Sequence, residues 1–336
     1  MIGAARLELG TFPTPFTPCP VLGSQLGVAD LWIKRDDLTG FSWSGNKVRT
    51  IEYLLGDAIV QAADTVIVSG GPTSNFAALM AVACAKHDIQ MHQVSYGTPP
   101  ETDPTALAVG RAAGATLHFT GSLERASMEE VAEKHAQALR GARRRPYLVP
   151  RGGATTVGAL GYAHAAGEFL CQLDQVGCDA VTIVIPVGSG GSIAGLLAGL
   201  TYQFAPIHLT RAIDVEVVGV SVSRSPENLR DSIAAKAEAC GAGLPKLRSV
   251  SCRWSLTDGR GVGFACHDEH EATQMDALML RTGLLVDPTY NGKAMLWLRR
   301  SPVKPDGPVV YWHTGGALGV ADQLRKAAAK QRRLQP

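Results

Sequence analysis

The chain has 336 residues, of which 46% are hydrophobic and 18% charged, an ordinary composition for a globular protein. Its formal net charge of +2 is nearly neutral for this length, so charge gives no argument for nucleic acid or a membrane surface as a partner. The first residues lack the pattern of a signal peptide and no apolar run reaches membrane-spanning length, so we expect a cytoplasmic protein.

Apolar strands and amphipathic helices alternate along the chain. Residues 31–34 predict a short strand, and from Lys47 onward apolar residues recur at helical spacing. Further strands are predicted at 65–69, 91–95, 115–120, 181–187, 215–222 and 308–313, and helices at 76–87, 124–140, 156–173 and 193–202. A continuous apolar strand such as 181–187 is typical of a parallel sheet covered on both faces. The alternation predicts a doubly wound α/β architecture.

Residues 188–195, GSGGSIAG, lie between a buried strand and a helix. Glycines let the backbone close around an anion, and the free N–H groups at the helix start supply positive potential. The segment lacks the Lys-Ser/Thr of a Walker loop, and its glycine spacing does not fit a dinucleotide fingerprint. We interpret it as a phosphate-binding loop. The alternative is a tight strand–helix turn that uses glycine for packing.

Lys47 closes the segment SGNK (44–47) and stands in the first turn of a predicted helix. The positive end of the helix dipole disfavours an ammonium ion there, and partial burial would lower its pKa further. Such a lysine is suited to imine formation with a carbonyl group. An ordinary surface lysine is the alternative. The Ser-x-x-Lys pattern of some acyl-transfer enzymes is set aside because its companion motifs are absent.

Three other segments carry polar side chains at turns. SGGPTSN (69–75) places Ser74 and Asn75 at a helix start, where they could receive a carboxylate or only cap the helix. HTGGALG (313–319) places Thr314 at the carboxyl edge of a strand, where ligands of open α/β folds bind. Tyr290 lies in a turn before a helix, either as a proton relay or as a packed ring.

The sequence does not predict a metal site. HDEH (267–270) holds two histidines three residues apart at a helix start, which are more often solvated than ligating, and no third ligand suggests itself. The seven cysteines are scattered, odd in number and without a Cys-x-x-Cys pair. We expect reduced, mostly buried thiols.

Taken together, these segments resemble the tryptophan-synthase-β-like (fold type II) pyridoxal-phosphate enzymes. Within that group they are similar to the D-cysteine desulfhydrase and 1-aminocyclopropane-1-carboxylate (ACC) deaminase family. The resemblance covers nearly the whole chain and is carried, in order, by LWIKRDDLTG, SGNKVR-IEYLL, ADTVIVSGG-SN, PRGGATTVGALGY, GSGGSIAGL, DPTYNGKAM and HTGGALG.

The expected fold is two-lobed α/β, each lobe an open, mostly parallel sheet flanked by helices. We expect a large cofactor-binding domain of residues 1–52 and 164–336 and a small domain of residues 53–163. A homodimer is expected from the resemblance.

The resemblance implies pyridoxal 5'-phosphate as the cofactor, bonded to Lys47 as a Schiff base. Asn75 would bond the ring hydroxyl of the cofactor, and Thr314 would face its pyridine nitrogen. The remaining expected cofactor contacts are Asn46 and the loop residues that would hold the phosphate, Gly188, Ser189, Gly190, Gly191 and Ser192.

The same resemblance implies roles on the side of a small amino-acid substrate. Ser74 would meet the substrate carboxylate or assist proton transfer, and Tyr290 would be the second acid or base. Asn75, Phe76 and Asn291 would contact the substrate.

Four positions depart from the usual family pattern. Thr50 stands where a second basic residue usually follows the lysine, and Phe76 replaces the histidine of Ser-Asn-His. Asn291 stands where the ACC deaminases resemble one another in having Glu and the desulfhydrases in having Thr. Trp43 is bulkier than the small residues common at its position. The cofactor machinery looks intact, whereas the substrate pocket looks altered.

The resemblance implies a lyase that eliminates a β substituent and releases a 2-oxo acid and ammonia. A neutral hydroxyl such as Thr314 would not force the ring nitrogen to stay protonated, which favours fast elimination over racemisation or transamination. A second interpretation uses the same cofactor for ACC-type ring opening, β-replacement or a specialised biosynthetic step. A third, of another class, is a regulatory protein that binds a phosphate or nucleotide at residues 188–195.

Overall fold

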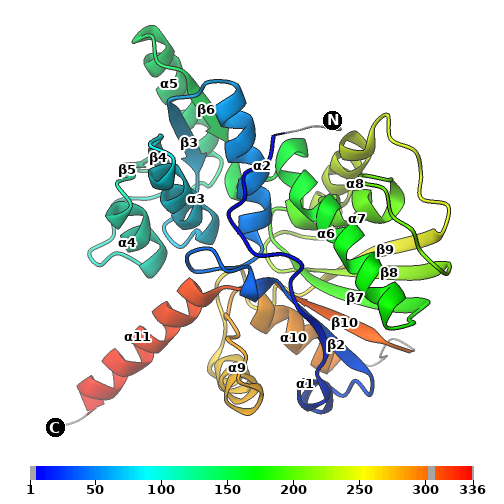
Figure 1. Cartoon of the computed structure of the whole chain (residues 1–336). Helices are drawn as coiled ribbons and strands as arrows, with labels where there is room; N and C mark the ends of the chain where they lie inside the picture. Colours follow the sequence, from blue (N-terminus) through cyan, green and yellow to red (C-terminus); the bar gives the residue numbers. More distant parts are fainter. Residues whose placement is uncertain (1–4, 302–306, 335–336) are drawn as a thin grey trace.

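A computed structural model describes residues 5–301 and 307–334 and shows two α/β units, each built on its own sheet (Figure 1). The large sheet has the strand order β1-β2-β10-β7-β8-β9, in which β1 is antiparallel to β2 and the other neighbours are parallel. Its strands are β1 (Phe16–Pro18), β2 (Leu31–Arg35), β7 (Ala180–Val187), β8 (Ile213–Ser221), β9 (Val250–Asp258) and β10 (Val309–His313).

Helices cover both faces of the large sheet. Tyr311 and Trp312, successive residues of β10, pack into two different core clusters, as alternating strand side chains must. The cluster around Trp312 contains α6 and α7, and the one around Tyr311 contains α1, α9 and α10. The helices outside the small sheet are α1 (Pro20–Leu26), α6 (Thr156–Gln175), α7 (Gly191–Thr201), α8 (Glu227–Gly241), α9 (Glu269–Thr282), α10 (Asn291–Arg300) and α11 (Ala317–Leu334), with 3-10 turns η1 (Asp36–Leu38) and η2 (Arg151–Gly153).

The small sheet is parallel throughout, with the order β5-β4-β3-β6. Its central strand β3 is buried along its whole length, as expected for a β-branched strand in a parallel sheet that is covered on both faces. The elements of this unit are β3 (Thr65–Ser69), β4 (Gln90–Ser95), β5 (Thr116–Phe119), β6 (Pro146–Val149), α3 (Asn75–Lys86), α4 (Thr105–Ala112) and α5 (Ser127–Gly141). Helix α2 (Lys47–Val60) packs with α3 in one core cluster, and α5 packs over Ile67 and Val94 in another.

The predicted α/β alternation is confirmed, and the predicted elements agree with the structure to within a few residues. The helix expected at 124–140 begins only at Ser127. Strands β1, β6 and β9 were not predicted. The strands of the small sheet lie between residues 53 and 163, but both ends of that range fall inside helices, α2 and α6. The domain division stays a prediction.

A buried carboxylate joins the segments that surround the large sheet. Asp36 accepts hydrogen bonds from Thr14 Oγ1 (2.9 Å), Arg49 Nη2 (2.8 Å), Tyr162 Oη (2.8 Å) and Trp312 Nε1 (2.9 Å). Burial raises the pKa of Asp36, but the charges of Arg49 and Lys34 and the indole hydrogen bond outweigh burial and hold it at about 2. Glu168 adds a second carboxylate, which pairs with Arg49 and Lys34. This cluster fixes α2 against α6 and β10.

The structure bears on the expected absence of membrane spans and on the expected state of the cysteines. Among the described residues, none of the helices has the length and apolarity that a bilayer crossing needs. All seven cysteines are free, as expected. The expectation that most of them are buried is wrong, because only Cys84 and Cys240 are buried, and Cys171 and Cys266 are exposed.

Replacing Asp36 by Asn is expected to lower the free energy of unfolding by about 3–5 kcal/mol, because the Arg49 guanidinium loses a buried partner. Denaturant unfolding at neutral pH measures the change. The folded pKa of about 2 lies below the unfolded value of 3.8, so the carboxylate stabilises fully above pH 4 and loses its effect as pH falls towards 2. The deficit of the variant should shrink over that range.

Asp214→Asn is the matched control, because Asp214 pairs with Arg253 on the surface. It should cost less than about 1 kcal/mol. Equal losses for the two variants would contradict the role given to Asp36.

Candidate active site

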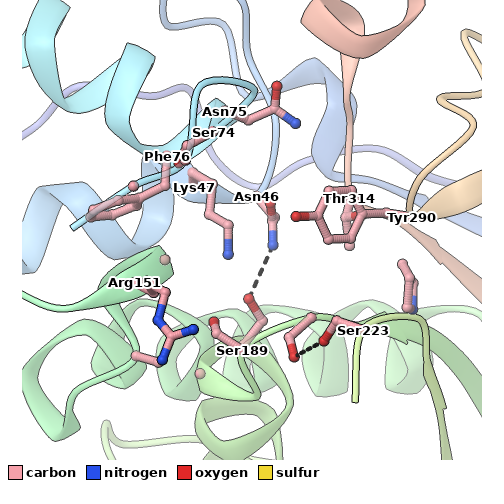
Figure 2. Close-up of a pocket in the computed structure, with 18 of the residues that line it drawn as sticks. Asn46, Lys47, Ser74, Asn75, Phe76, Arg151, Ser189, Ser223, Tyr290 and Thr314 are labelled. Atoms are coloured by element: carbon pink, nitrogen blue, oxygen red, sulfur yellow. Dashed lines mark hydrogen bonds between the residues drawn. The ribbon is translucent and has the colours of Figure 1, made fainter. Parts of the chain in front are cut away.

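One cavity of about 380 Å³ collects the predicted site residues from both units of the chain (Figure 2). Its volume lies in the range of small-molecule sites. The predicted residues that line it are Asn46, Lys47, Ser74, Asn75, Phe76, Gly188, Ser189, Gly190, Gly191, Ser192, Tyr290 and Thr314. The starts of helices α2, α3 and α7 meet there. The structure thus brings together residues from segments far apart in sequence, with one exception, Asn291.

Lys47 is the first residue of α2 and points into the cavity (Figure 2). Burial lowers the pKa of its ammonium from 10.5 to about 8, so about a tenth of it is the neutral amine at pH 7, far more than for an ordinary lysine. The preceding residue, Asn46, donates its backbone N–H to Thr314 O (3.0 Å) and its amide Nδ2 to Ser192 Oγ (3.0 Å). These bonds fix the start of α2 relative to the two other strand–helix junctions.

The loop 188–192 forms a cradle that only small residues fit. Gly190 has φ +89°, and a Cβ on it would come 2.8 Å from the Ile233 side chain. A Cβ on Gly188 would come 3.0 Å from the Tyr290 ring. Helix α7 begins at Gly191, and the first N–H groups of a helix have no partner within it. Backbone donors, the hydroxyls of Ser189 and Ser192 and a helix start together suit a phosphate.

The lysine and the cradle face each other across a short gap. A Cβ on Gly152, which has φ +66°, would come 2.7 Å from Ser189 Oγ and 3.9 Å from Lys47 Nζ. An amine of lowered pKa therefore lies beside an anion-binding loop. This donor set fits a phosphorylated aldehyde such as pyridoxal phosphate, with Lys47 to bond the aldehyde and the loop to hold the phosphate.

Helix α3 brings Ser74, Asn75 and Phe76 to the opposite wall. Ser74 caps the helix by accepting a hydrogen bond from Ala77 N (3.2 Å). Phe76 is only 2% exposed and forms an apolar wall of the cavity. Behind this turn, Gln93 and Ser95 donate hydrogen bonds to the carbonyl of Gly70. Neither support was predicted, because the sequence of their strand, β4, does not show which of its faces lies beside the loop.

Tyr290 and Thr314 lie on the remaining side of the cavity. Burial and the charge of Asp287 raise the pKa of Tyr290 to about 12, so its hydroxyl is protonated at neutral pH. Asp287 holds the turn by accepting hydrogen bonds from the backbone N–H groups of Thr289, Tyr290 and Asn291.

Asn291 does not line the cavity, although it was expected to contact the substrate. It is fully buried, donates to Asp287 Oδ1 (2.7 Å) and Gly315 O (2.7 Å), and accepts a hydrogen bond from Thr314 N (3.2 Å). Asn291 thus connects Thr314 and Gly315 to Asp287, which holds the turn that carries Tyr290.

Positive side chains on the cavity wall escaped the sequence analysis. Arg125, Arg151, Arg224 and Lys236 all line the cavity. Partial burial and the neighbouring charges of Arg151 and Arg125 lower the pKa of Arg224. Glu129 pairs with Arg151 at 2.6 Å, which leaves an excess of positive charge that favours anionic ligands. Arg151 belongs to the motif PRGGATTVGALGY, which was not assigned a role as a source of charge, and the other three residues belong to no motif. The histidines of HDEH, His267 and His270, are exposed outside this cavity.

Comparison with known proteins identifies the family. Residues 7–315 match the family model described as "Pyridoxal-phosphate dependent enzyme". The chain belongs to this family. It is therefore a pyridoxal-phosphate enzyme, and the third interpretation, a regulatory phosphate- or nucleotide-binding protein, is set aside. The expected cofactor and the two-sheet fold are confirmed at the level of the family.

Curated relatives narrow the branch within the pyridoxal-phosphate family. A putative ACC deaminase of Pyrococcus abyssi is 32% identical over 320 residues, covering 94% of this chain and 92% of the relative. The D-cysteine desulfhydrase of Salmonella typhi is 33% identical over 326 residues, covering 93% and 94%. The crystal structure of an ACC deaminase homologue superposes with a TM-score of 0.80 at 31% identity, covering 96% of each chain. The resemblance to this branch is confirmed.

If Lys47 is the residue that bonds the aldehyde, the rate at which the apoenzyme binds pyridoxal phosphate covalently should rise with pH and level off above a midpoint of about 8, because only the neutral amine attacks a carbonyl group. The visible absorbance of the bound cofactor follows the reaction. A midpoint near 10.5, the ordinary lysine value, would contradict the lowered pKa of Lys47. Lys236→Ala is the control: it removes another lysine of the cavity and should leave the midpoint near 8, whatever its effect on the rate.

Proposed function

We propose that the chain is a lyase that removes a β substituent from a small amino acid and releases a 2-oxo acid and ammonia. One observation carries the proposal: a lysine of lowered pKa, a phosphate cradle, a protonated tyrosine and a neutral hydroxyl share one cavity. The names of the relatives, D-cysteine desulfhydrase and ACC deaminase, support it. In the reaction, the Cα–H and Cβ–X bonds break and X leaves with its electron pair. Water then hydrolyses the resulting aminoacrylate.

Lys47 serves two functions in this proposal. When bound, pyridoxal phosphate supplies an electron sink that makes the α proton of an amino acid removable. The Nζ of Lys47 holds the cofactor between turnovers and, once free, is the base that takes the α proton. A pKa of about 8 suits this role, because a base works best when its pKa lies near the working pH. Ser74 and Asn75, at the start of α3, orient the carboxylate of the substrate with hydroxyl, amide and backbone donors.

Tyr290 is the proton donor in this scheme. Its pKa of about 12 leaves it protonated at neutral pH, so its Oη donates to the leaving group and does not serve as the base. The ring packs edge-on against Phe264, at a centroid distance of 6.1 Å, and Asp287 fixes the turn that carries it. The ring and the turn that carries it are thus held in place on the cavity wall.

Thr314 would hold the ring nitrogen of the bound cofactor with its hydroxyl group. A neutral hydroxyl does not keep a ring nitrogen protonated, as a carboxylate would, so the cofactor would withdraw charge from the α carbon less strongly. We expect departure of the leaving group to be favoured over reprotonation. Asn291 Oδ1 accepts hydrogen bonds from the backbone N–H (3.2 Å) and from Oγ1 (3.4 Å) of Thr314, and we propose that Asn291 positions this hydroxyl.

The side chains of the cavity wall favour elimination from a substrate whose β substituent is anionic. Phe76 removes a polar group from the substrate side, whereas Arg125 and Arg224 add positive charge to the cavity wall. A substrate with an anionic β substituent gains from this charge, and its leaving group departs as an anion. Ring opening and β-replacement with the same cofactor are the competing uses of the site.

We propose that the chain works as a homodimer in the cytoplasm, as the family resemblance suggests. Size-exclusion chromatography with light scattering measures the mass in solution, and a monomeric mass would contradict the dimer.

A substrate panel tests the reaction. The purified holoenzyme should release ammonia and a 2-oxo acid from at least one of D-cysteine, L-cysteine, β-chloroalanine, serine and O-phosphoserine, and not open the ring of 1-aminocyclopropane-1-carboxylate. Lys47→Ala should lose the borohydride-reducible cofactor and at least about 100-fold in kcat. Turnover of the cyclopropane alone, or of none of these compounds, would overturn the elimination proposal in favour of ring opening or a specialised reaction.

Thr314→Asp should raise racemisation and transamination relative to elimination by roughly 10-fold, equivalent to about 1.4 kcal/mol between the two barriers. A carboxylate keeps the ring nitrogen protonated and prolongs the charge at the α carbon. Product ratios by chiral chromatography measure the change. Thr314→Ser, which retains the hydroxyl, should keep the wild-type ratio. An unchanged ratio in the Asp variant would remove Thr314 from this role.

A further inference from the structure

Three histidines from separate elements converge on one side of the small sheet. His92 lies on β4, His118 on the neighbouring strand β5 and His135 on α5. In the parallel register His92 is opposite Thr116 and Val94 is opposite His118, so the two histidines are offset by two residues and share a sheet face. Helix α5 packs over Val94 on that face, which brings His135 to the same point. None of the three lines the Lys47 cavity.

The ring nitrogens of these histidines face one another. His92 Nδ1 is 2.7 Å from His135 Nε2 and 3.1 Å from His118 Nε2, and the three candidate donor atoms all lie within 4.8 Å of one another. A neutral imidazole nitrogen offers either one proton or one lone pair. The Nδ1 of His92 can therefore make one good hydrogen bond, yet it faces two partners. Three lone pairs directed at a shared cation would resolve this conflict.

We propose that His92, His118 and His135 form a binding site for a divalent transition-metal ion of the zinc type. Imidazole suits Zn²⁺, with Zn–N distances of about 2.0–2.1 Å, which places tetrahedral ligand nitrogens about 3.3 Å apart. The observed separations of 2.7 and 3.1 Å are within about 0.6 Å of that value, and the third, between His118 and His135, is at most 4.8 Å. Bringing the His118 and His135 nitrogens to about 3.3 Å apart needs a relative movement of at most about 1.5 Å, and water takes the fourth position.

One cation, Arg144, lies near the three rings. The positive charge of Arg144 is offset by Asp64, at 3.1 Å, and its guanidinium donates to Thr65 and Gln90. The three ligands are half-buried, which leaves an entry path for the ion from solvent.

The site is structural rather than catalytic. A metal ion there would join β4, the edge strand β5 and helix α5 at one point. The first turn of α5 carries Met128 and Glu129, which line the Lys47 cavity, and Glu129 pairs with Arg151. His135 lies two helical turns further along α5 from Met128. The ion would thus hold the helix that forms one wall of the active site.

Zinc binding to the holoenzyme tests the proposal directly. The parent protein is tag-free and carries Cys171→Ser and Cys266→Ser, because these two exposed thiols could bind zinc themselves. Titration calorimetry with Zn²⁺, supported by metal analysis after dialysis, should give one ion per chain. His135→Gln and His118→Gln, which alter two different elements, should each weaken the affinity by at least about 100-fold.

The matched control is His267→Gln with His270→Gln, which removes an exposed histidine pair and should leave zinc affinity unchanged. Far-UV circular dichroism checks that each variant is folded. Cobalt(II) bound to the parent should give tetrahedral d–d bands without thiolate charge transfer, and His135→Gln should abolish them. The proposal is overturned if the parent binds no zinc, if either ligand variant binds it as tightly as the parent, or if zinc binds only at one ion per two chains.

Discussion

The buried carboxylate of Asp36 is the interaction on which the rest of the structure depends. It binds Arg49, two residues after Lys47 on α2, and Trp312, two residues before Thr314 on β10. The segments that carry the amine and the hydroxyl of the site are therefore anchored to one charge. Such a charge is tolerable in the core only because cations and hydrogen-bond donors surround it. Asp36 thereby helps to fix the relative positions of Lys47 and Thr314.

The backbone forms the proposed phosphate-binding loop of the cavity, whereas side chains form its remaining walls. Glycines and helix starts build the phosphate cradle, and no other residue type fits where a Cβ would strike Ile233 or Ser189. Larger residues at these positions would have to displace their neighbours. The walls made by Phe76, Arg125 and Arg224 are formed by side chains. In the proposed function, the backbone part holds the cofactor and the side-chain walls select the substrate.

Most of the fold was predictable because its strands are buried and its helices have regular apolar spacing. The missed strand β9 carried a usable signal, since Val250, Cys252, Trp254 and Leu256 alternate with polar residues. It lies at the edge of the sheet and is mostly half-exposed, so it lacks the continuous apolar run of β7. The cysteines were misjudged because residue type indicates average burial, and Cys171 lies on the outer face of α6.

The alternation of apolar strands and helices predicted the α/β class, and local patterns of strand, glycine and helix start marked the junctions that bear Lys47, Ser74 and Thr314. The family and the cofactor followed from the resemblance that these motifs carry. Which distant residues contact one another could be seen only in the folded structure. Asn291 lies behind Thr314 and not in the cavity, and the arginines from separate segments line the cavity wall. His92, His118 and His135 lie close together on the small sheet. Contacts between distant segments depend on strand register and helix packing, and a sequence motif records neither.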